Sequence, residues 1–427
     1  MTSIADTLGS AHLAWLNGEE QRLLAFAHAV VREDGMANWL ASDGSADPGK
    51  PAATWITCRM AHVHYLAALR GIPGARATAE RLLHGIDTMA RDPEHGGWLE
   101  TAESSPDDDK LAYTAAFVVI ASGSAAIAGD PDGVRILRDA LAVIDRLFGD
   151  AARPLIADRV SGDGTTVDPY RGINANMHFV EALLTAWQAL GDDALVERAV
   201  AICRFVADQA AGNGWRIPEH FDAAWAPQPE YHADSPADQF RPYGATVGHA
   251  LEWSRLLLQA DAHLEGGDDL TAAAVELYRH AVADGWARNG RPGFLYTTGW
   301  DGTPVISDRL HWVAAEAVGA AAALYQATGE TEYLDDYLRW LDYADAYFLD
   351  REFGSWIHQL DPTNVPSTTI WEGKPDIYHA YQAVILPMLP LAASPAGAIL
   401  AARERAGGHP GRRADGPARR HPATNSG

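Results

Sequence analysis

Helical periodicity runs almost from one end of this 427-residue chain to the other, and no other feature constrains the fold as strongly. Apolar residues recur at the spacing of a helix face in stretch after stretch, whereas the alternation typical of strands is scarce. Short polar connections join these stretches in pairs, as in arrays of helical hairpins. The predicted helices span residues 10–34, 54–70, 75–91, 110–128, 132–148, 174–190, 193–211, 246–262, 268–288, 309–327, 331–349 and 376–393.

A short turn that combines glycine with a large apolar residue separates successive hairpins. A spacing of about 60 residues, longer where a loop is inserted, suits two helices and a turn. Twelve helices in six hairpins can close into an (α/α)6 barrel with an inner and an outer ring, and an open solenoid is the alternative. We predict an all-α fold and infer that the barrel closes. The turns are Gly96-Gly97-Trp98, Gly214-Trp215, Gly293-Phe294 and Gly354-Ser355-Trp356, with Pro154-Leu155 as a degenerate member.

One repeat pattern predicts one barrel domain over residues 1–406, although the length alone would suit two or three average domains. Residues 407–427 are rich in Gly, Pro and Arg and are predicted to form a disordered tail. Two inserted loops, 213–245 and 351–375, are Pro-rich and aromatic and lack a helical period. Long ordered loops in compact folds are disproportionately functional, so we expect these two loops to border a site.

Composition excludes several classes of partner. The net charge of −24 and a pI near 5.0 argue against nucleic acid, whose phosphates need Lys/Arg patches. No uncharged apolar run is long enough for a membrane span, and the first residues lack the pattern of a signal peptide, so a cytoplasmic location is predicted. The two cysteines, Cys58 and Cys203, lie in apolar helical stretches and are expected to be buried free thiols.

A polar pair recurs at the start of several predicted helices, each time just before an Ala/Leu-rich run. Residues three or four apart lie on one helix face, one turn from each other. Several helices therefore direct polar first turns towards one place, which we interpret as the rim of a single active site. The pairs are Asn174–His178, His249–Glu252, Trp312–Glu316 and Asp376–His379.

His249 and His379 are the strongest candidates for proton transfer. Each begins a helix directly after an inserted loop, and each has an acidic residue one turn away. The ordinary pKa of histidine, about 6.5, suits both giving and taking a proton near neutral pH. The alternative interpretation is a pair of helix-start histidines that hydrogen-bond their own loops.

Other polar residues in apolar surroundings are candidates for binding. Arg59 lies inside an apolar helix, where a guanidinium must be paired or must face a polar cavity. Tyr113 occurs in a similar context. Asn174 and His178 share a helix face and suit hydrogen bonds to sugar-like hydroxyls, whereas Asn176 points elsewhere and is a candidate structural cap.

Metal and nucleotide chemistry are not expected. His62 and His64 are two apart, so on a helix their side chains diverge and do not chelate one ion together. The sequence has no HExxH, CxxC, P-loop or strand-associated GxGxxG motif. An enzyme that depends on a nucleotide phosphate or a dinucleotide is therefore not expected.

Four ordered segments resemble the N-acylglucosamine 2-epimerase superfamily, and within it the bacterial mannose isomerase and sulfoquinovose isomerase branch. The similarity extends over residues 10–395 and implies an (α/α)6 barrel that interconverts an aldose and a ketose at C1 and C2 without a metal or cofactor. The segments are RGINANMHFVEALLTAWQALGD, RPYGATVGHALEWSRLLL, HWVAAEAVGAAAALYQATGE and GKPDIYHAYQAVILP.

The resemblance also implies roles for particular residues. His379 is expected to move a proton from C2 to C1 through a cis-enediol, and His249 to open the sugar ring, although the two roles can be exchanged. Arg59 and His178 are expected to donate to the enediolate, and Glu252 and Glu316 to orient the histidines. The substrate-binding set is Arg59, Tyr113, Asn174, His178, Arg241, Glu252, Trp312, Glu316, Trp371, Lys374 and Asp376.

The expected ligand is a free monosaccharide, and the leading hypothesis is interconversion of D-mannose and D-fructose. Sulfoquinovose isomerisation and 2-epimerisation of a hexose or N-acyl sugar are the near alternatives. Remoter alternatives are a glycan hydrolase or lyase, since hydrolysis needs a carboxylate pair rather than histidines, and a non-catalytic sugar-binding barrel. The oligomeric state stays open.

Overall fold

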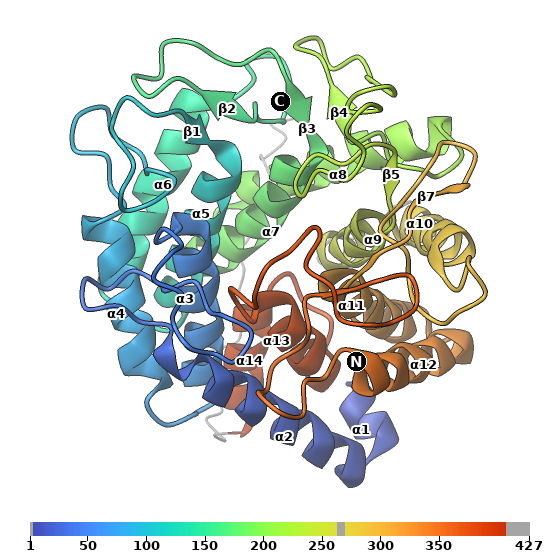
Figure 1. Ribbon diagram of the computed structural model, residues 1–427. Helices are drawn as coiled ribbons and strands as arrows, with labels where there is room; N and C mark the ends of the chain where they lie inside the picture. The colour runs from blue at the N-terminus through green and yellow to red at the C-terminus, as the bar shows by residue number, and fades with distance from the viewer. Residues whose placement is uncertain (1–2, 263–269, 407–427) are drawn as a thin grey trace, which may run out of the picture.

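The computed structural model describes residues 3–262 and 270–406. Within these residues two concentric rings of helices surround one axis, as Figure 1 shows. The inner ring consists of α3 (Thr54–Leu69), α5 (Ala112–Ile127), α7 (Ile173–Leu190), α9 (Val247–Asp261), α11 (His311–Thr328) and α13 (Tyr378–Ile385). The outer ring consists of α2 (Ser10–Phe26), α4 (Ala75–Thr88), α6 (Gly133–Leu147), α8 (Asp193–Gly212), α10 (Leu270–Gly285) and α12 (Thr331–Tyr347). The predicted double ring is confirmed.

The sequence of each helix explains which ring it joins. The inner helix α5, AYTAAFVVIASGSAAI, is apolar around its whole circumference and is buried along nearly all of its length. The outer helix α6, GVRILRDALAVIDRL, buries one stripe that includes Ile136, Ala140 and Ile144, and its charged residues lie on the other face. An all-round apolar helix must be covered on every side, whereas an amphipathic helix needs one partner face.

The two ends of the chain close the ring. Helix α13 packs between α11 and α3, and the first long helix, α2, packs against it. Glu20 of α2 accepts hydrogen bonds from Tyr381 of α13 at 2.8 Å and from Arg70, just after α3, at 2.7 Å. Closure is therefore confirmed, and the sixth hairpin joins the beginning of the chain to its end.

Some helix ends differ from the prediction. Helix α2 stops at Phe26 and is followed by the 3-10 turn η1 (Ala27–Ala29), well before residue 34. Helix α13 stops at Ile385 because Pro387 cannot continue the hydrogen-bond ladder, and η2 (Leu386–Met388) follows. The sequence analysis did not predict α1 (Ile4–Leu8) or α14 (Pro395–Ala406). The start at residue 268 of the predicted helix 268–288, which corresponds to α10, and the predicted tail 407–427 lie outside the described residues.

Short antiparallel strand pairs fix where most inner helices begin. Except in the pair of β6 with β7, one strand directly precedes an inner helix, and its partner lies between the following outer helix and the next inner helix. Segments of two or three residues are too short to show alternation, so the sequence did not predict them. The pairs are β1 (Lys110–Leu111) with β2 (Arg159–Val160), β3 (Arg171–Gly172) with β4 (His220–Phe221), β5 (Ala245–Thr246) with β6 (Thr297–Thr298), β6 also with β7 (Pro304–Ile306), and β8 (Arg309–Leu310) with β9 (Gln359–Leu360).

The predicted glycine-plus-apolar turns follow the outer helices. An antiparallel bridge closes several of these turns, and the large apolar side chain is buried. The degenerate turn at Pro154-Leu155 has the same arrangement, with a bridge between Gly149 and Ile156. The other bridges are Arg91 with Trp98, Trp286 with Phe294 and Leu349 with Trp356. At Gly214-Trp215, in contrast, Trp215 is only partly buried. In the other four turns a buried apolar residue covers the end of the hairpin.

The inserted loops lie at the rim where the inner helices begin. In Figure 1 the orange-red segment that leads into α13 passes in front of α11 and α13. Among the described residues no helix is both long enough and apolar enough to cross a membrane.

Candidate active site

A pocket of about 540 Å³ opens at this rim. Gln239 and Phe240 from one inserted loop and Trp371 from the other form part of its wall, as the loop composition led us to expect. All six inner helices, or the residues just before them, contribute polar side chains to it. The predicted residues in the wall are Arg59, Tyr113, Asn174, His178, His249, Glu252, Trp312, Trp371, Asp376 and His379.

His379, in the first turn of α13, is held through its Nδ1 atom. Oε1 of Glu316, on α11, lies 2.9 Å from Nδ1, and both side chains are buried. A carboxylate at Nδ1 favours the tautomer that carries its proton there, which leaves Nε2 as an acceptor. Burial, and then the charge of Arg59, lowers the pKa of His379 well below its ordinary value. His379 is therefore a neutral imidazole near pH 7 that can take a proton at Nε2.

His249, in the first turn of α9, is held in the same way, but by a residue that the sequence analysis missed. Oε2 of Glu219, in the loop before β4, lies 2.9 Å from Nδ1 of His249. The expectation that Glu252 orients His249 is wrong, because Glu252 contacts Arg255 instead. Residues three apart share a helix face, yet a side chain from another segment can approach the imidazole more directly than its own helical neighbour.

Trp312 links the two histidines. Its ring centre lies 5.3 Å from that of His249 and 5.9 Å from that of His379. Gly248, beside His249, permits this approach, since a Cβ atom there would lie 2.2 Å from the Trp312 ring. Both imidazoles thus border one aromatic wall.

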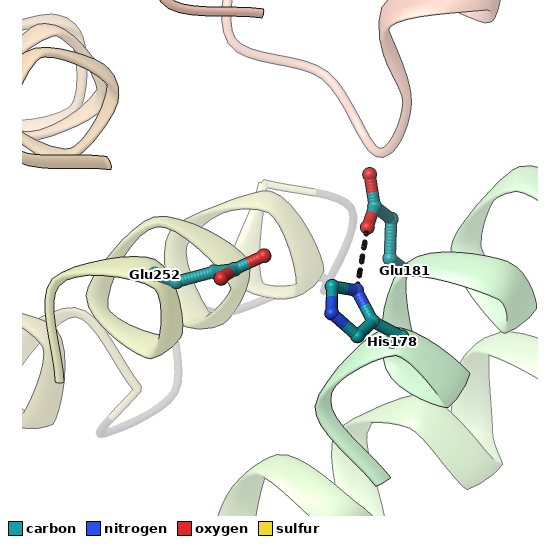
Figure 2. Close-up of side chains that lie close together, drawn as sticks. All are labelled: His178, Glu181 and Glu252. Atoms are coloured by element: carbon teal, nitrogen blue, oxygen red, sulfur yellow. Dashed lines mark hydrogen bonds and ion pairs between the residues drawn. The ribbon is translucent and has the colours of Figure 1, made fainter. Parts of the chain in front are cut away.

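His178 lies on α7 with its Nδ1 atom 3.4 Å from Oε2 of Glu181, and Glu252 on α9 faces the pair (Figure 2). Burial lowers the pKa of His178 to about 4, so its ring is neutral. If Nδ1 donates to Glu181, Nε2 is an acceptor. This contact favours acceptance of a hydroxyl proton over the oxyanion-donor role that the resemblance implied.

The two asparagines of α7 face different surroundings, as predicted. Asn174 lines the pocket. Asn176 instead accepts from the backbone N–H of Ile156 at 3.0 Å and donates to the carbonyls of Ile156 and Gly172. Asn176 therefore ties the start of α7 to the preceding turn.

Arg59 is buried in the wall and is paired, as its apolar helix required. It donates to the hydroxyl of Tyr113 at 2.8 Å and contacts Asp376 at 3.3 Å. One of its terminal nitrogens also lies 3.4 Å from Nε2 of His379, and because a guanidinium can only donate, this contact too requires Nε2 to be an acceptor. Its guanidinium also lies 4.7 Å from the ring centre of Tyr378. Asp376 thus binds Arg59 and does not act as the orienting acid of His379. Burial raises the pKa of Tyr113 to about 12, so its hydroxyl stays protonated.

Behind the pocket, Arg255 of α9 contacts two glutamates. Its Nε atom lies 3.0 Å from Oε2 of Glu316, and one of its terminal nitrogens lies 3.4 Å from Oε1 of Glu252. Burial raises the pKa of both carboxyls, that of Glu252 well above its ordinary value. The shorter contacts of Glu316 favour a charge there and a proton on Glu252, which then faces the pocket as a neutral donor.

Three predicted residues do not line the pocket. Glu316 lies behind it, beside His379. Arg241 lines a neighbouring cavity of about 600 Å³, with its guanidinium 4.0 Å from the ring centre of Tyr170. Lys374 donates to Asp350 at 2.6 Å and to the carbonyl of Gly354 at 2.8 Å. Lys374 therefore ties the inserted loop to the outer ring and does not line the pocket.

Several residues of the site were not predicted. Glu219 and the pocket residue His358 lie in the inserted loops, where an acid or a histidine was a usable signal. His311 stacks on His358 with ring centres 3.7 Å apart. Arg255 interrupts an apolar helix as Arg59 does, so the same argument could have identified it. Glu181 gave no such signal, because a single glutamate in a helix is ordinary.

Two groups of buried side chains have geometries that an ion could use. Their ligand atoms lie within 4.8 Å of one another, and the groups are His178–Glu181–Glu252 and Glu252–Glu316–His379. Protein donors already reach both groups: Tyr378 donates to Glu181 at 2.6 Å, and Arg255 to Glu316 at 3.0 Å. A cation would compete with the Arg255 guanidinium, so the donor set fits a metal poorly, and the expectation of metal-free chemistry stays a prediction.

The fold and the site define a class, that of (α/α)6-barrel enzymes with paired histidines at the barrel mouth. The chain belongs to the N-acylglucosamine 2-epimerase (GlcNAc 2-epimerase) family, whose model matches residues 35–383. The resemblance of the four motifs is therefore confirmed.

Named relatives and a solved structure agree with this membership. The chain is 46% identical to a D-mannose isomerase from Thermobifida fusca over 399 residues, which cover 92% of this chain and 98% of the relative. It is 42% identical to a D-mannose isomerase from Pseudomonas cannabina pv. alisalensis over 396 residues, or 91% and 95% of the two chains. A crystal structure of a D-mannose isomerase matches with a TM-score of 0.82 at 25% identity, covering 88% of this chain and 97% of that one.

Proposed function

We propose that this sugar isomerase interconverts D-mannose and D-fructose by histidine-mediated proton transfer. The broader assignment, an aldose-ketose isomerase, rests on the family and on relatives at 46% and 42% identity. The observation that carries the mechanism is the matched pair of histidines. Each has Nδ1 at 2.9 Å from a buried glutamate, and both flank Trp312.

Ring opening comes first. His249 moves a proton between the anomeric hydroxyl and the ring oxygen, which breaks the bond from C1 to the ring oxygen and gives an open-chain aldehyde. Glu219 at Nδ1 fixes the tautomer and stabilises the transient imidazolium. His178 and Asn174 are suited to hold sugar hydroxyls at the other wall of the pocket.

Isomerisation follows at C1 and C2. Nε2 of His379 takes the proton from C2, the C–H electron pair forms the C1=C2 bond, and the aldehyde oxygen becomes the enediolate oxygen. The imidazolium returns that proton to C1, while the proton of the C2 hydroxyl passes to O1 and leaves the ketone at C2. Arg59 and the protonated Glu252 supply the donors that such a developing oxyanion needs.

The near alternatives differ in what the pocket must supply. A 2-epimerase would protonate C2 from both faces, with His249 and His379 on opposite sides. A sulfonated sugar would need cationic donors near C6. Arg241 is the nearest candidate, but it lies in the neighbouring cavity among carboxyls that include Asp158. This arrangement favours a neutral hexose.

Proton NMR in D2O tests the proposal. Wild-type protein incubated with mannose, fructose, glucose, lyxose and sulfoquinovose should convert mannose and fructose, with deuterium entering at C1 or C2, and should do so equally in EDTA. His379→Gln should abolish exchange, and His249→Gln should slow the reaction of the ring form by at least about 100-fold. Normal mannose conversion by both variants, or complete loss in EDTA, would contradict the mechanism.

A further inference from the structure

We propose that Arg255 is a positioning residue that keeps Glu316 ionised and thereby keeps Nε2 of His379 unprotonated, so that it can accept the substrate proton. The inference rests on the proposed role of His379 as the base. Arg255 touches neither the pocket nor the reacting atoms and acts through Glu316.

The contacts form a chain from the far side of the barrel to the base. Gln259 accepts from Arg255 at 3.0 Å, Arg255 donates to Oε2 of Glu316 at 3.0 Å, and Oε1 of Glu316 lies 2.9 Å from Nδ1 of His379. Arg255 and Glu316 each have side chains only 2% exposed. Each oxygen of Glu316 is thus engaged on a different side.

The fold makes room for this guanidinium. Gly319 of α11 lies beside its stem, and a Cβ atom there would approach Cδ of Arg255 to 3.3 Å. Arg255, Gln259 and Gly319 also line a second cavity, of about 340 Å³, towards the other end of the barrel. Arg255 therefore stands between the substrate pocket and that cavity, at the level where the carboxyls gather.

Charge neutralisation explains why a cation is needed there. Glu181, Glu252 and Glu316 point to the axis from α7, α9 and α11, and buried carboxylates without a cation take up protons. Besides His379, the titratable groups that face this cluster include Arg59 and His62 of α3, Tyr113 of α5, His178 of α7, and Tyr378 of α13. Arg59 is already paired with Asp376, which leaves Arg255 to neutralise Glu316.

The consequence for catalysis concerns the tautomer of His379. An ionised Glu316 can only accept, so Nδ1 keeps its proton and Nε2 keeps its lone pair. A protonated Glu316 can donate to Nδ1, which would place the imidazole proton on Nε2, opposite the Arg59 nitrogen that lies 3.4 Å away. Nε2 could then no longer accept a proton from C2.

Neutral variants of Arg255 test this. In Arg255→Met and Arg255→Gln we expect kcat to fall by about 100-fold with KM changed by less than about 3-fold, because the interaction is needed in the transition state. The acid limb of the pH profile of kcat should move to higher pH by about one unit. Nitrogen NMR of His379 should show the imidazole proton on Nε2. Arg255→Lys keeps the charge and should recover at least about 10-fold over Arg255→Met.

The matched control is Arg70→Met, which also removes a guanidinium from a buried glutamate, Glu20, but away from the pocket. It should change thermal stability and leave the acid limb in place. A folded Arg255→Gln with the wild-type acid limb and tautomer would overturn the proposal, and this variant retains a donor for Glu316 should Arg255→Met not fold. Exchange in His379→Gln would instead overturn the proposed function, so the two failures are distinguishable.

Discussion

At the scale of single residues, the site is built from polar groups that burial holds in one protonation state. His379 and His178 are neutral because desolvation lowers their pKa, and Tyr113 keeps its proton because desolvation raises its pKa. Because these groups keep one protonation state near neutral pH, the proton that the reaction transfers can be moved between defined atoms.

Burial of histidine also makes the stability depend on pH. His64 of α3 is buried with both ring nitrogens unpaired, and burial lowers its pKa to about 4. Below about pH 6.5 this residue binds more protons in the unfolded chain than in the folded chain. The contribution of the neutral His64 to stability is therefore present at pH 7 and is lost as pH falls.

The expected outcome is a variant that tolerates acid better. The free energy of unfolding of His64→Leu, relative to that of wild type, should be about 2 kcal/mol more favourable at pH 5 than at pH 7. Urea unfolding at both pH values measures this difference. His84→Leu, at an exposed position of α4, is measured alongside as the surface control. An equal pH dependence in wild type and His64→Leu would contradict the assignment of a buried neutral imidazole.

At the scale of elements, the short strand pairs and the close helix contacts decide where the first turns lie. The inner helices α9 and α11 approach closely at Gly248, so that Trp312 can contact both histidines. The sequence predicted which first turns carry polar residues, because that depends on helical spacing. It did not predict that Glu219 binds His249, because that bond joins a loop to a helix.

A pair of glycine variants tests this helix contact. Gly248→Ala places a Cβ atom 2.2 Å from the Trp312 ring and should cost about 1–3 kcal/mol of stability, because rigid aromatic atoms must move. It should also lower kcat. Gly18→Ala in α2 has open space around it and should instead stabilise by about 0.5–1 kcal/mol with unchanged kcat, measured by urea unfolding and hexose conversion.

At the scale of the whole molecule, the barrel depends on the contact between its two ends. Glu20 of α2 is 1% exposed and binds both Tyr381 of α13 and Arg70 beyond α3. Its removal leaves a guanidinium and a hydroxyl without their partner at the seam that closes the ring.

Glu20→Ala should therefore destabilise the protein by about 3 kcal/mol, as expected when one partner of a buried ion pair is lost. Thermal or urea unfolding measures this change. Glu80→Ala removes a glutamate from the exposed Arg76–Glu80 pair and should cost no more than about 0.5 kcal/mol. Similar losses in the two variants would show that the seam is not a special point of the ring.

The sequence by itself determined the helices, their ring and the end of the barrel at which polar first turns meet. Those features follow from periodicity and spacing, which are local properties of the chain. Only the tertiary structure decided that Glu219 and Glu316 hold the two histidines, that Arg255 neutralises Glu316, and that Lys374 lies outside the pocket. These pairings join segments far apart in the chain, and their partners are selected by burial and by side-chain direction, which helical spacing does not specify.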